Sequence, residues 1–238
     1  QARAAARLIA ITYAEEAGEF ELKAALNKAT KPAGEGDQSP DSSTGNFDQA
    51  FAEAPVTIDA TFTTPVHIHA QMEPHASLAY WKDGRVHIHC SSQLLESAQK
   101  CVANTLQIPA SKVRIVSRYI GGGFGGKLPI YGDVLLAAMA SRQLNRPVKT
   151  ALTRQQMFHV TTHRSDTVQR LRLGARSDGV LTAISHESWS HAARFDDFYE
   201  PAAQATRTLY AAPHRQTRHR SVALDLPVSD STRAPGEA

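Results

Sequence analysis

The chain has 238 residues, of which 42% are apolar and 21% charged, and its formal net charge is +3. This composition is that of a globular protein and excludes a disordered one, while the small net charge gives no sign of nucleic-acid binding. No apolar run reaches the ~18 residues that a membrane-spanning helix needs. The two cysteines, Cys90 and Cys101, form neither a metal-binding pattern nor a disulfide framework.

The first 46 residues predict short elements followed by a linker. We expect the end of an alanine-rich helix over 1–9, a strand over 10–15 and a weak helical turn over 22–29. Residues 30–46 are rich in Pro, Gly, Ser, Asp and Thr, which predicts a linker. Residues 1–29 are therefore interpreted as the end of a preceding α+β domain, with the main boundary near residue 47. Both ends look cut from a longer protein.

From residue 47 onward, strands outnumber helices. The expected strands cover 56–63, 67–69, 78–81, 86–90, 113–120, 148–152, 168–175, 180–189 and 219–226. The expected helical stretches cover 94–106, 133–144, 153–158 and part of 198–209, and residues 47–51 are a short element with regularly spaced apolar residues. Asp83-Gly84 and Asp178-Gly179 predict hairpin turns. Several strands with a few helices and no regular β-α-β alternation predict the α+β class.

A glycine-rich stretch, Gly121-Gly-Gly-Phe-Gly-Gly-Lys127, lies between an expected strand and an expected helix. Glycine reaches positive φ without Cβ strain and lets a ligand approach the main chain closely. Successive N–H groups in such a loop can converge on an anion. The stretch therefore predicts a binding loop for a phosphate or another oxyanion group.

Two common nucleotide motifs fit this stretch poorly. The dinucleotide fingerprint Gly-x-Gly-x-x-Gly is present, but no acidic residue stands between Asp133 and Asp166 to hold a ribose. The phosphate-loop pattern is also partly present, but Leu128 stands where magnesium binding needs Ser or Thr. A plain turn in which the bare backbone packs against other backbone remains a further alternative.

Four segments in the same order resemble motifs of the xanthine dehydrogenase/aldehyde oxidase family. They are Met72-Glu-Pro-His75, Ser91-Ser-Gln93, Ile120-Gly-Gly-Gly-Phe-Gly-Gly-Lys127 and Ser231-Thr-Arg-Ala-Pro-Gly-Glu-Ala238. The resemblance is to the molybdenum-binding large subunit and covers the whole chain. The segments Thr162-His-Arg164, His186-Glu-Ser-Trp189 and Arg233–Ala238 look closest to the bacterial aldehyde oxidoreductase branch.

This resemblance implies an oxidoreductase that hydroxylates aldehydes or N-heterocycles with water as the oxygen source. The implied cofactor is a molybdenum–pterin, for which the cytosine dinucleotide form is one candidate. The implied partners are an iron–sulfur subunit, an FAD subunit and the remainder of the large subunit. It also implies that residues 47–238 form the first part of a molybdopterin-binding domain.

The resemblance assigns roles to a few residues. Gln93 and Arg233 are expected at the catalytic centre, with Gln93 beside the molybdenum and Arg233 facing the substrate. Phe124 is also expected near the molybdenum, with its ring close to the substrate. Gly122, Gly123, Phe124, Gly125 and Arg233 are expected to bind the cofactor, and no residue is expected to ligate the metal directly. The residues by themselves also allow blander roles: a helix-cap neighbour for Gln93, a loop anchor with a buried or stacked ring for Phe124 and a surface arginine for Arg233.

Two departures from the family pattern bear on activity. Xanthine-specific members carry a glutamate after the lysine of the glycine motif, whereas this chain has Leu128, which favours aldehydes or less polar heterocycles. The catalytic glutamate of the family lies further downstream than residue 238, and Glu237 is not that residue. A non-catalytic fragment that binds no cofactor, or only a partner protein, is therefore the competing interpretation.

Histidines suggest one further site. His67, His69, His75, His87 and His89 include two His-x-His pairs, and alternate residues of a strand share a face. A zinc site is geometrically possible, although no cysteine or acidic residue completes a four-ligand set at the usual spacing. Polar or surface roles are the alternative. The chain carries no targeting signal, so the sequence indicates no compartment.

Overall fold

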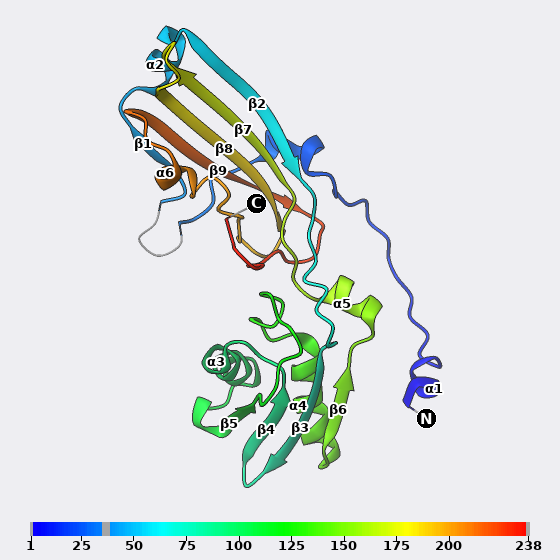
Figure 1. Cartoon of the computed structure of the whole chain (residues 1–238). Coiled ribbons are helices and arrows are strands. Elements are labelled where there is room, and N and C mark those ends of the chain that lie inside the picture. Colours follow the sequence, from blue (N-terminus) through cyan, green and yellow to red (C-terminus); the bar gives the residue numbers. More distant parts are fainter. Residues whose placement is uncertain (1, 35–38, 237–238) are drawn as a thin grey trace.

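The computed structural model describes residues 2–34 and 39–236 and contains two β-sheets, one above the other in Figure 1. Two segments cross between the sheets: residues 65–75, and the stretch around helix α5 (Arg154–Val160). Part of the expected linker, residues 35–38, lies outside the described residues, as do Glu237 and Ala238 of the last motif. The mixed architecture confirms the predicted α+β class.

The larger sheet has the strand order β1-β9-β8-β7-β2. Its strands are β1 (Ser42–Thr44), β2 (Val56–Thr64), β7 (Thr167–Ala175), β8 (Leu181–Ala193) and β9 (His214–Leu224). All neighbours pair antiparallel except β8 and β9, which run parallel and are joined by a crossover that contains the short helix α6 (Thr206–Leu209).

Two short helical elements pack on this sheet. Helix α2 (Phe47–Glu53) contacts β7, β8 and β9, and Arg172 lies over the ring of Phe47. The 3-10 helix η1 (Leu22–Lys28) packs on β9, where its buried Leu22 and Ala25 meet Val168, Val222 and Leu224. Residues before the expected boundary near 47 therefore contribute to the core of the larger sheet.

The smaller sheet has the order β5-β4-β3-β6. Its strands are β3 (Ala76–Lys82), β4 (Arg85–Cys90), β5 (Val113–Val116) and β6 (Val148–Ala151). The hairpin turn between β3 and β4 has positive φ at both Asp83 and Gly84, 50° and 69°, as a two-residue hairpin turn requires. Helix α3 (Leu95–Leu106), with the 3-10 turn η2 (Ala110–Lys112) after it, carries the chain from β4 to β5, which pair parallel.

One face of the smaller sheet carries its core. Helix α3 and helix α4 (Gly132–Leu144) both pack there, and their apolar side chains meet those of the strands. The fully buried residues of this cluster are Ala79, Val86, Ile88, Val102, Val113, Ala137 and Ala138. The opposite face of the sheet has no helix on it among the described residues.

Most predicted elements are confirmed, with several corrections. The stretch expected to be a linker, residues 30–46, contains strand β1, which pairs with β9. The expected strand over 10–15 is exposed and irregular, because no strand edge among the described residues pairs with it; only helix α1 (Ala2–Ala6) precedes it. Residues 67–69 form an isolated bridge between His67 and Arg164 rather than a strand. Strand β5 ends at Val116, four residues earlier than predicted.

A further correction concerns β2. Its alternating sequence predicted a half-buried strand, but β2 is an edge strand with both faces largely exposed, and Ile58 and Phe62 are each 55% exposed. The alternation of apolar and polar residues correctly identified a strand. It could not predict how exposed the strand is, because that depends on whether another described element packs on it. No helix of the described residues is long and apolar enough to cross a membrane.

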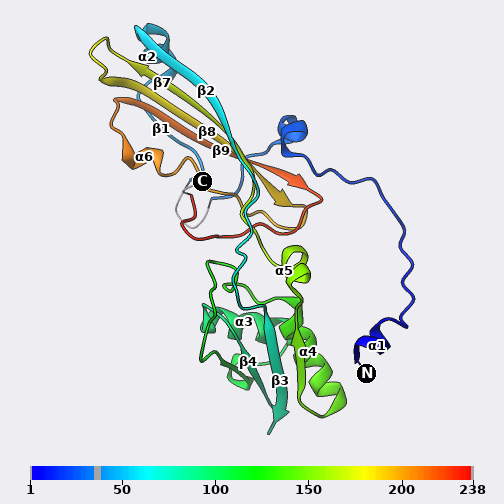
Figure 2. The ribbon, with the colours of Figure 1, turned by 45° about the vertical axis from the view of Figure 1, so that its right-hand side comes forward.

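The glycine stretch lies where the two sheets approach each other. In both views the loops above α3 and α4 point towards the chain end that leaves the larger sheet (Figure 2). Backbone contacts between the two segments confirm this proximity, because the N–H of Arg233 donates to the carbonyl oxygen of Phe124. The seam between the sheets is therefore where the predicted site residues gather.

Candidate functional site

The glycine loop, residues 121–126, is an irregular connection between β5 and α4. Gly122, Phe124 and Gly125 all have positive φ, at 89°, 54° and 99°. Two of these values suit glycine, whereas Phe124 adopts the left-handed region at a cost of roughly 1–3 kcal/mol. A left-handed aromatic residue persists only where its surroundings hold it, which indicates a tightly built loop.

The other glycines are required for close approach. A Cβ on Gly121 would lie 2.5 Å from Glu73, and one on Gly123 would lie 2.3 Å from the amide oxygen of Gln93. At Gly126 a Cβ would lie 2.7 Å from the ring of His69. The missing side chains therefore let partners from elsewhere in the chain press directly against the loop backbone.

Glu73 and Lys127 anchor the loop at its two ends. The side chain of Lys127 is fully buried and forms an ion pair with Oε2 of Glu73. The same oxygen accepts hydrogen bonds from the N–H of Gly121 at 2.8 Å and from Oγ of Ser91 at 2.8 Å. Partial burial acts to raise the pKa of Glu73, but the bonds from Lys127, Gly121 and Ser91 outweigh it and hold that pKa below its usual range.

Gln93 supports the middle of the loop. Its side-chain oxygen Oε1 accepts from the backbone N–H groups of Gly125 at 3.2 Å and Lys127 at 3.1 Å. The backbone N–H of Gln93 donates to the backbone carbonyl of Lys127. The side chain is exposed, and its Nε2 has no acceptor among the described residues. Gln93 therefore keeps two amide donors free while its oxygen fixes the loop.

The last segment, residues 231–236, lies against the loop from the larger sheet. A Cβ on Gly125 would lie 2.1 Å from the carbonyl oxygen of Ser231, and the N–H of Arg233 donates to the carbonyl of Phe124 at 2.9 Å. The exposed side chain of Arg233 makes no hydrogen bond or ion pair with another described residue. The structure thus brings Gln93, the glycine loop and Arg233 together, as the sequence motifs implied.

Arg164 holds this last segment in place. It is 7% exposed, and its Nη2 donates to the carbonyls of Arg233 at 2.6 Å, Ala234 at 2.8 Å and Thr232 at 3.3 Å. Ala234 has a φ of 56°, another strained position. Buried Glu200, whose carboxylate lies 3.9 Å from Nε of Arg164, accepts from the N–H of Gly236 at 2.6 Å.

Three N–H groups of the loop are left without protein acceptors. Among the described residues, the amides of Gly122, Gly123 and Phe124 have no hydrogen-bond partner. They occur in succession where the backbone has left-handed turns, a geometry that favours anions and oxo groups. Phe124 was expected to have a buried or stacked ring; the residue is 47% exposed, and its ring packs beside Gly122.

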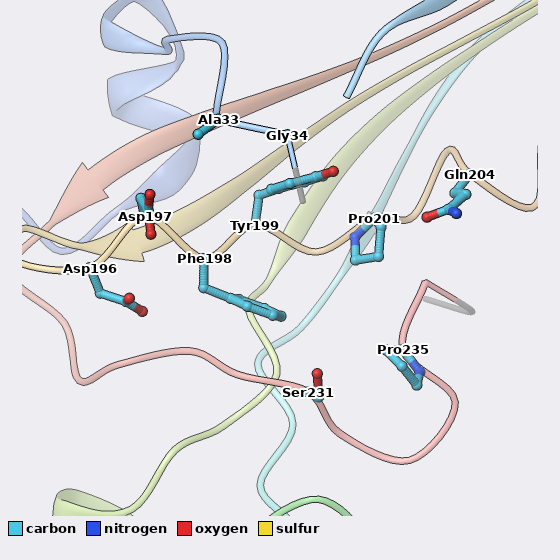
Figure 3. A pocket seen from close by; sticks show the side chains of 10 residues that line it. All are labelled: Ala33, Gly34, Asp196, Asp197, Phe198, Tyr199, Pro201, Gln204, Ser231 and Pro235. Atoms are coloured by element: carbon cyan, nitrogen blue, oxygen red, sulfur yellow. The ribbon is translucent and has the colours of Figure 1, made fainter. Parts of the chain in front are cut away.

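A cavity of about 310 Å³ borders the last segment (Figure 3). Ser231 and Pro235 line it together with Phe198 and Tyr199 and the neighbouring carboxylates Asp196 and Asp197. Burial raises the pKa of Asp196. No described residue of the glycine loop lines this cavity, so it borders the segment of Arg233 but not the loop itself.

The histidines do not gather into a metal site. His87 and His89 stack on Tyr80, at ring-centroid distances of 4.8 and 6.0 Å, whereas buried His69 contacts the last segment and His75 bonds Gln71. Among the described residues no group of three or more potential ligands could hold a metal ion. The zinc alternative therefore finds no support.

Comparisons with known proteins identify the family. A family model described as "Molybdopterin cofactor-binding domain" matches residues 31–238. Since that match covers most of the chain, this protein belongs to the molybdopterin cofactor-binding domain family.

Two curated relatives show which members of the family this chain is similar to. The chain is 45% identical over all 238 residues to the aldehyde oxidoreductase molybdenum-binding subunit PaoC of Escherichia coli K12, and covers 32% of that protein. It is 31% identical over 188 residues to the xanthine dehydrogenase molybdenum-binding subunit of Escherichia coli O157:H7, covering 77% of this chain and 25% of the relative. The chain thus spans about a third or less of the length of these relatives.

Solved structures share the fold. The structural match to the aldehyde oxidoreductase of Desulfovibrio gigas covers 99% of this chain and 27% of that protein's chain, with a TM-score of 0.85 at 24% identity. Quinoline 2-oxidoreductase of Pseudomonas putida 86 matches 100% of this chain and 32% of its own, with a TM-score of 0.86 at 22% identity. At these identities the likeness establishes the fold alone.

Sequence reasoning found the motifs but missed three supporting residues. Glu73 and Lys127 were part of recognised motifs, yet nothing in the sequence paired them across 54 positions. Arg164 was noted only as part of a local resemblance. Its role depends on carbonyl groups about 70 residues away, which no local pattern reveals.

Proposed function

We propose that this chain is the cofactor-cradling part of a longer molybdenum-binding subunit that oxidises aldehydes. The observation that carries the proposal is the convergence of three motifs: Oε1 of Gln93 accepts from the loop, and the loop carbonyl of Phe124 accepts from Arg233. Identity of 45% to an aldehyde oxidoreductase subunit over the full chain supports it.

The free donors fit the proposed cofactor. Gly122, Gly123 and Phe124 would hold it through their unpaired N–H groups, and Nε2 of Gln93 would donate to an oxo group beside the metal. When bound, the cofactor supplies the two-electron oxidation of the substrate carbon, with water as the oxygen source. Further proposals are the cytosine dinucleotide form of the pterin and electron transfer to iron–sulfur and FAD partner subunits.

Arg233 would orient the substrate. Its guanidinium is exposed beside the loop, while its backbone is fixed by Phe124 and by Arg164. A planar fork of donors suits a polarised carbonyl oxygen. Leu128, half-buried just after the loop, offers no charge to a purine, so we propose a preference for aldehydes over xanthine.

The domain assignment is also a proposal. Residues 47–238 would form the first part of the molybdopterin-binding domain and residues 1–29 the end of a preceding domain. Residues 30–46 would be a linker that also contributes the edge strand β1 to the larger sheet. Because Leu22 and Ala25 pack against β9, the boundary divides stretches of sequence rather than separate cores. We also propose that the isolated chain is inactive, because the catalytic glutamate of the family would be supplied by another part of the subunit.

The test uses the complete subunit with its partner subunits. Gln93→Ala and Arg233→Ala are compared with Gln143→Ala and Arg146→Ala, which remove the same side chains from exposed positions on or after α4. Loss of one donor aimed at developing charge lowers kcat/KM by about 100-fold. We expect losses of that order in the first pair and unchanged values in the second.

Molybdenum content and substrate preference complete the test. We expect stoichiometric molybdenum by elemental analysis and a higher kcat/KM for an aromatic aldehyde than for xanthine. A complete assembly without molybdenum or turnover would instead support the non-catalytic alternative. A preference for xanthine would refute the role given to Leu128 without touching the cofactor assignment.

A further inference from the structure

The smaller sheet has one open face. Val86 and Ile88 of β4 point into the core under α3 and α4, and each is fully buried. Residues between and beside them, Arg85, His87 and His89, therefore point to the opposite face. The register of β3, β5 and β6 extends this face on both sides of β4.

Among the described residues, the strands give this outer face several basic side chains and no acidic one. From the strands β3 to β6 it carries Leu78, Tyr80, Lys82, Arg85, His87, His89, Arg114 and Lys149. Lys82 lies directly across from Arg85, and His87 lies directly across from Arg114. Like charges placed opposite each other on a sheet are destabilising, so the pair of Lys82 and Arg85 costs stability in the free chain.

The larger sheet shows that such an arrangement is not general in this protein. There Arg170 pairs with Asp59, Arg218 with Glu187 and Arg220 with Asp41. In contrast, no described acidic residue forms an ion pair with Lys82, Arg85, Arg114 or Lys149. The cations of the smaller sheet are thus left unmatched within residues 2–34 and 39–236.

Rings cover the centre of the same face. Tyr80 and His87 stack at 4.8 Å between centroids with planes 5° apart, and the ring of His89 lies 6.0 Å from that of Tyr80. Tyrosine and arginine are enriched at protein interfaces, where rings give rigid contact area and guanidinium groups pair with carboxylates. Burial lowers the pKa of His87, and the neighbouring side chains of Arg114, Lys82 and Arg85 lower it further.

We propose that this face docks an acidic surface of a partner protein subunit, with Arg85 and Arg114 as its charged contacts and Tyr80 at its centre. Charge complementarity selects the occupant, because an acidic partner supplies the carboxylates that the larger sheet finds within its own chain. The net charge of only +3 argues for a local protein contact rather than for a nucleic-acid footprint. Only the choice of a subunit as the partner rests on the proposed function.

The experiment reverses the charge of this face in the complete subunit. Arg85→Glu with Arg114→Glu is compared with Lys23→Glu with Arg146→Glu, which make the same charge change at exposed positions on η1 and after α4. Subunit association is measured by sedimentation at 50 and 300 mM salt. We expect association about tenfold weaker for the first double variant and little remaining salt dependence, with the control unchanged.

Footprinting guards against an indirect effect. Hydroxyl-radical labelling of Tyr80, His87 and His89 should fall when the complete wild-type subunit joins its partners. Equal association of both double variants, or labelling that is already low in the unassembled subunit, would overturn the proposal. So would binding of a labelled single-stranded oligonucleotide by this face without any change in assembly.

The same samples separate this inference from the proposed function. An assembly that contains no molybdenum but still weakens on charge reversal would refute the proposed function and leave the docking face standing. An active assembly whose association is unchanged by the charge reversal would refute the docking face and leave the proposed function standing.

Discussion

The backbone of Gly125 touches that of Ser231: a Cβ on the glycine would lie 2.1 Å from the serine carbonyl oxygen. This contact joins the two sheets at the candidate site, because Gly125 follows β5 of the smaller sheet and Ser231 follows β9 of the larger one. The site therefore depends on both sheets at once.

Gly125→Ala should destabilise the protein by at least about 2 kcal/mol, since it adds a clash with backbone to a residue with a φ of 99°. Gly132→Ala is the matched control, because a Cβ there meets nothing within 4 Å. We expect the control to change stability by no more than about 1 kcal/mol. Urea unfolding of both variants measures the difference, and similar values would contradict the close contact.

The ion pair of Glu73 and Lys127 should respond asymmetrically to mutation. Lys127 is fully buried, whereas the side chain of Glu73 is 39% exposed and keeps bonds from Gly121 and Ser91. Glu73→Ala leaves the buried ammonium of Lys127 without its carboxylate partner and should lower the free energy of unfolding by about 3 kcal/mol. Lys127→Met leaves a partly solvated carboxylate and should cost roughly 1 kcal/mol. The reverse order in denaturant unfolding would show that Lys127 has another partner.

Replacing Arg164 should loosen the last segment without unfolding the protein. Arg164→Lys keeps the charge but cannot reproduce the set of bonds to the carbonyls of Thr232, Arg233 and Ala234. We expect amide hydrogen exchange over residues 231–236 to rise about tenfold, the factor that loss of about 1.4 kcal/mol gives. Arg170→Lys, at an exposed pair with Asp59, serves as the control and should leave that segment unchanged.

Stability should fall as the pH drops from 6.5 to 4, partly through His186. Burial lowers the pKa of His186 to about 4, and both ring nitrogens are engaged, by Thr206 and Gln169. The unfolded chain binds a proton below about 6.5. Since the folded state does not do so until about 4, acid favours unfolding across that window and adds nothing above it.

The variant His186→Gln should remove that contribution. Its unfolding free energy should fall less steeply than that of the parent, by up to about 1.4 kcal/mol per pH unit. Urea unfolding at pH 7.5, 6.0 and 5.0 compares the two slopes. Parallel slopes would place the histidine in a solvated position.

Local patterns predicted elements well and contacts poorly. Asp83-Gly84 predicted its hairpin because the turn needs positive φ at two adjacent positions, and both are observed. Residues 10–15 have strand-like alternation but stay unpaired, because a strand exists only where another edge accepts its hydrogen bonds.

The candidate site shows the same division. The motifs that contain Gln93, Phe124 and Arg233 could be read from the sequence and lie together in the structure. The exposure of Phe124 could not be predicted from the sequence, because the position of its ring depends on a left-handed backbone conformation that only the surrounding contacts stabilise. The clamp by Arg164 is a long-range contact to main-chain carbonyls, which carry no sequence signal.

The two segments that cross between the sheets also carry side chains that touch the candidate site: His69 and Glu73 lie against the glycine loop, and Arg164 holds the last segment. The relative position of the two sheets and the contact between Gly125 and Ser231 therefore depend on the same short stretches of chain. A substitution at His67, whose backbone pairs with that of Arg164, would therefore act on the site by displacing Arg164 and the carbonyl groups that Arg164 holds.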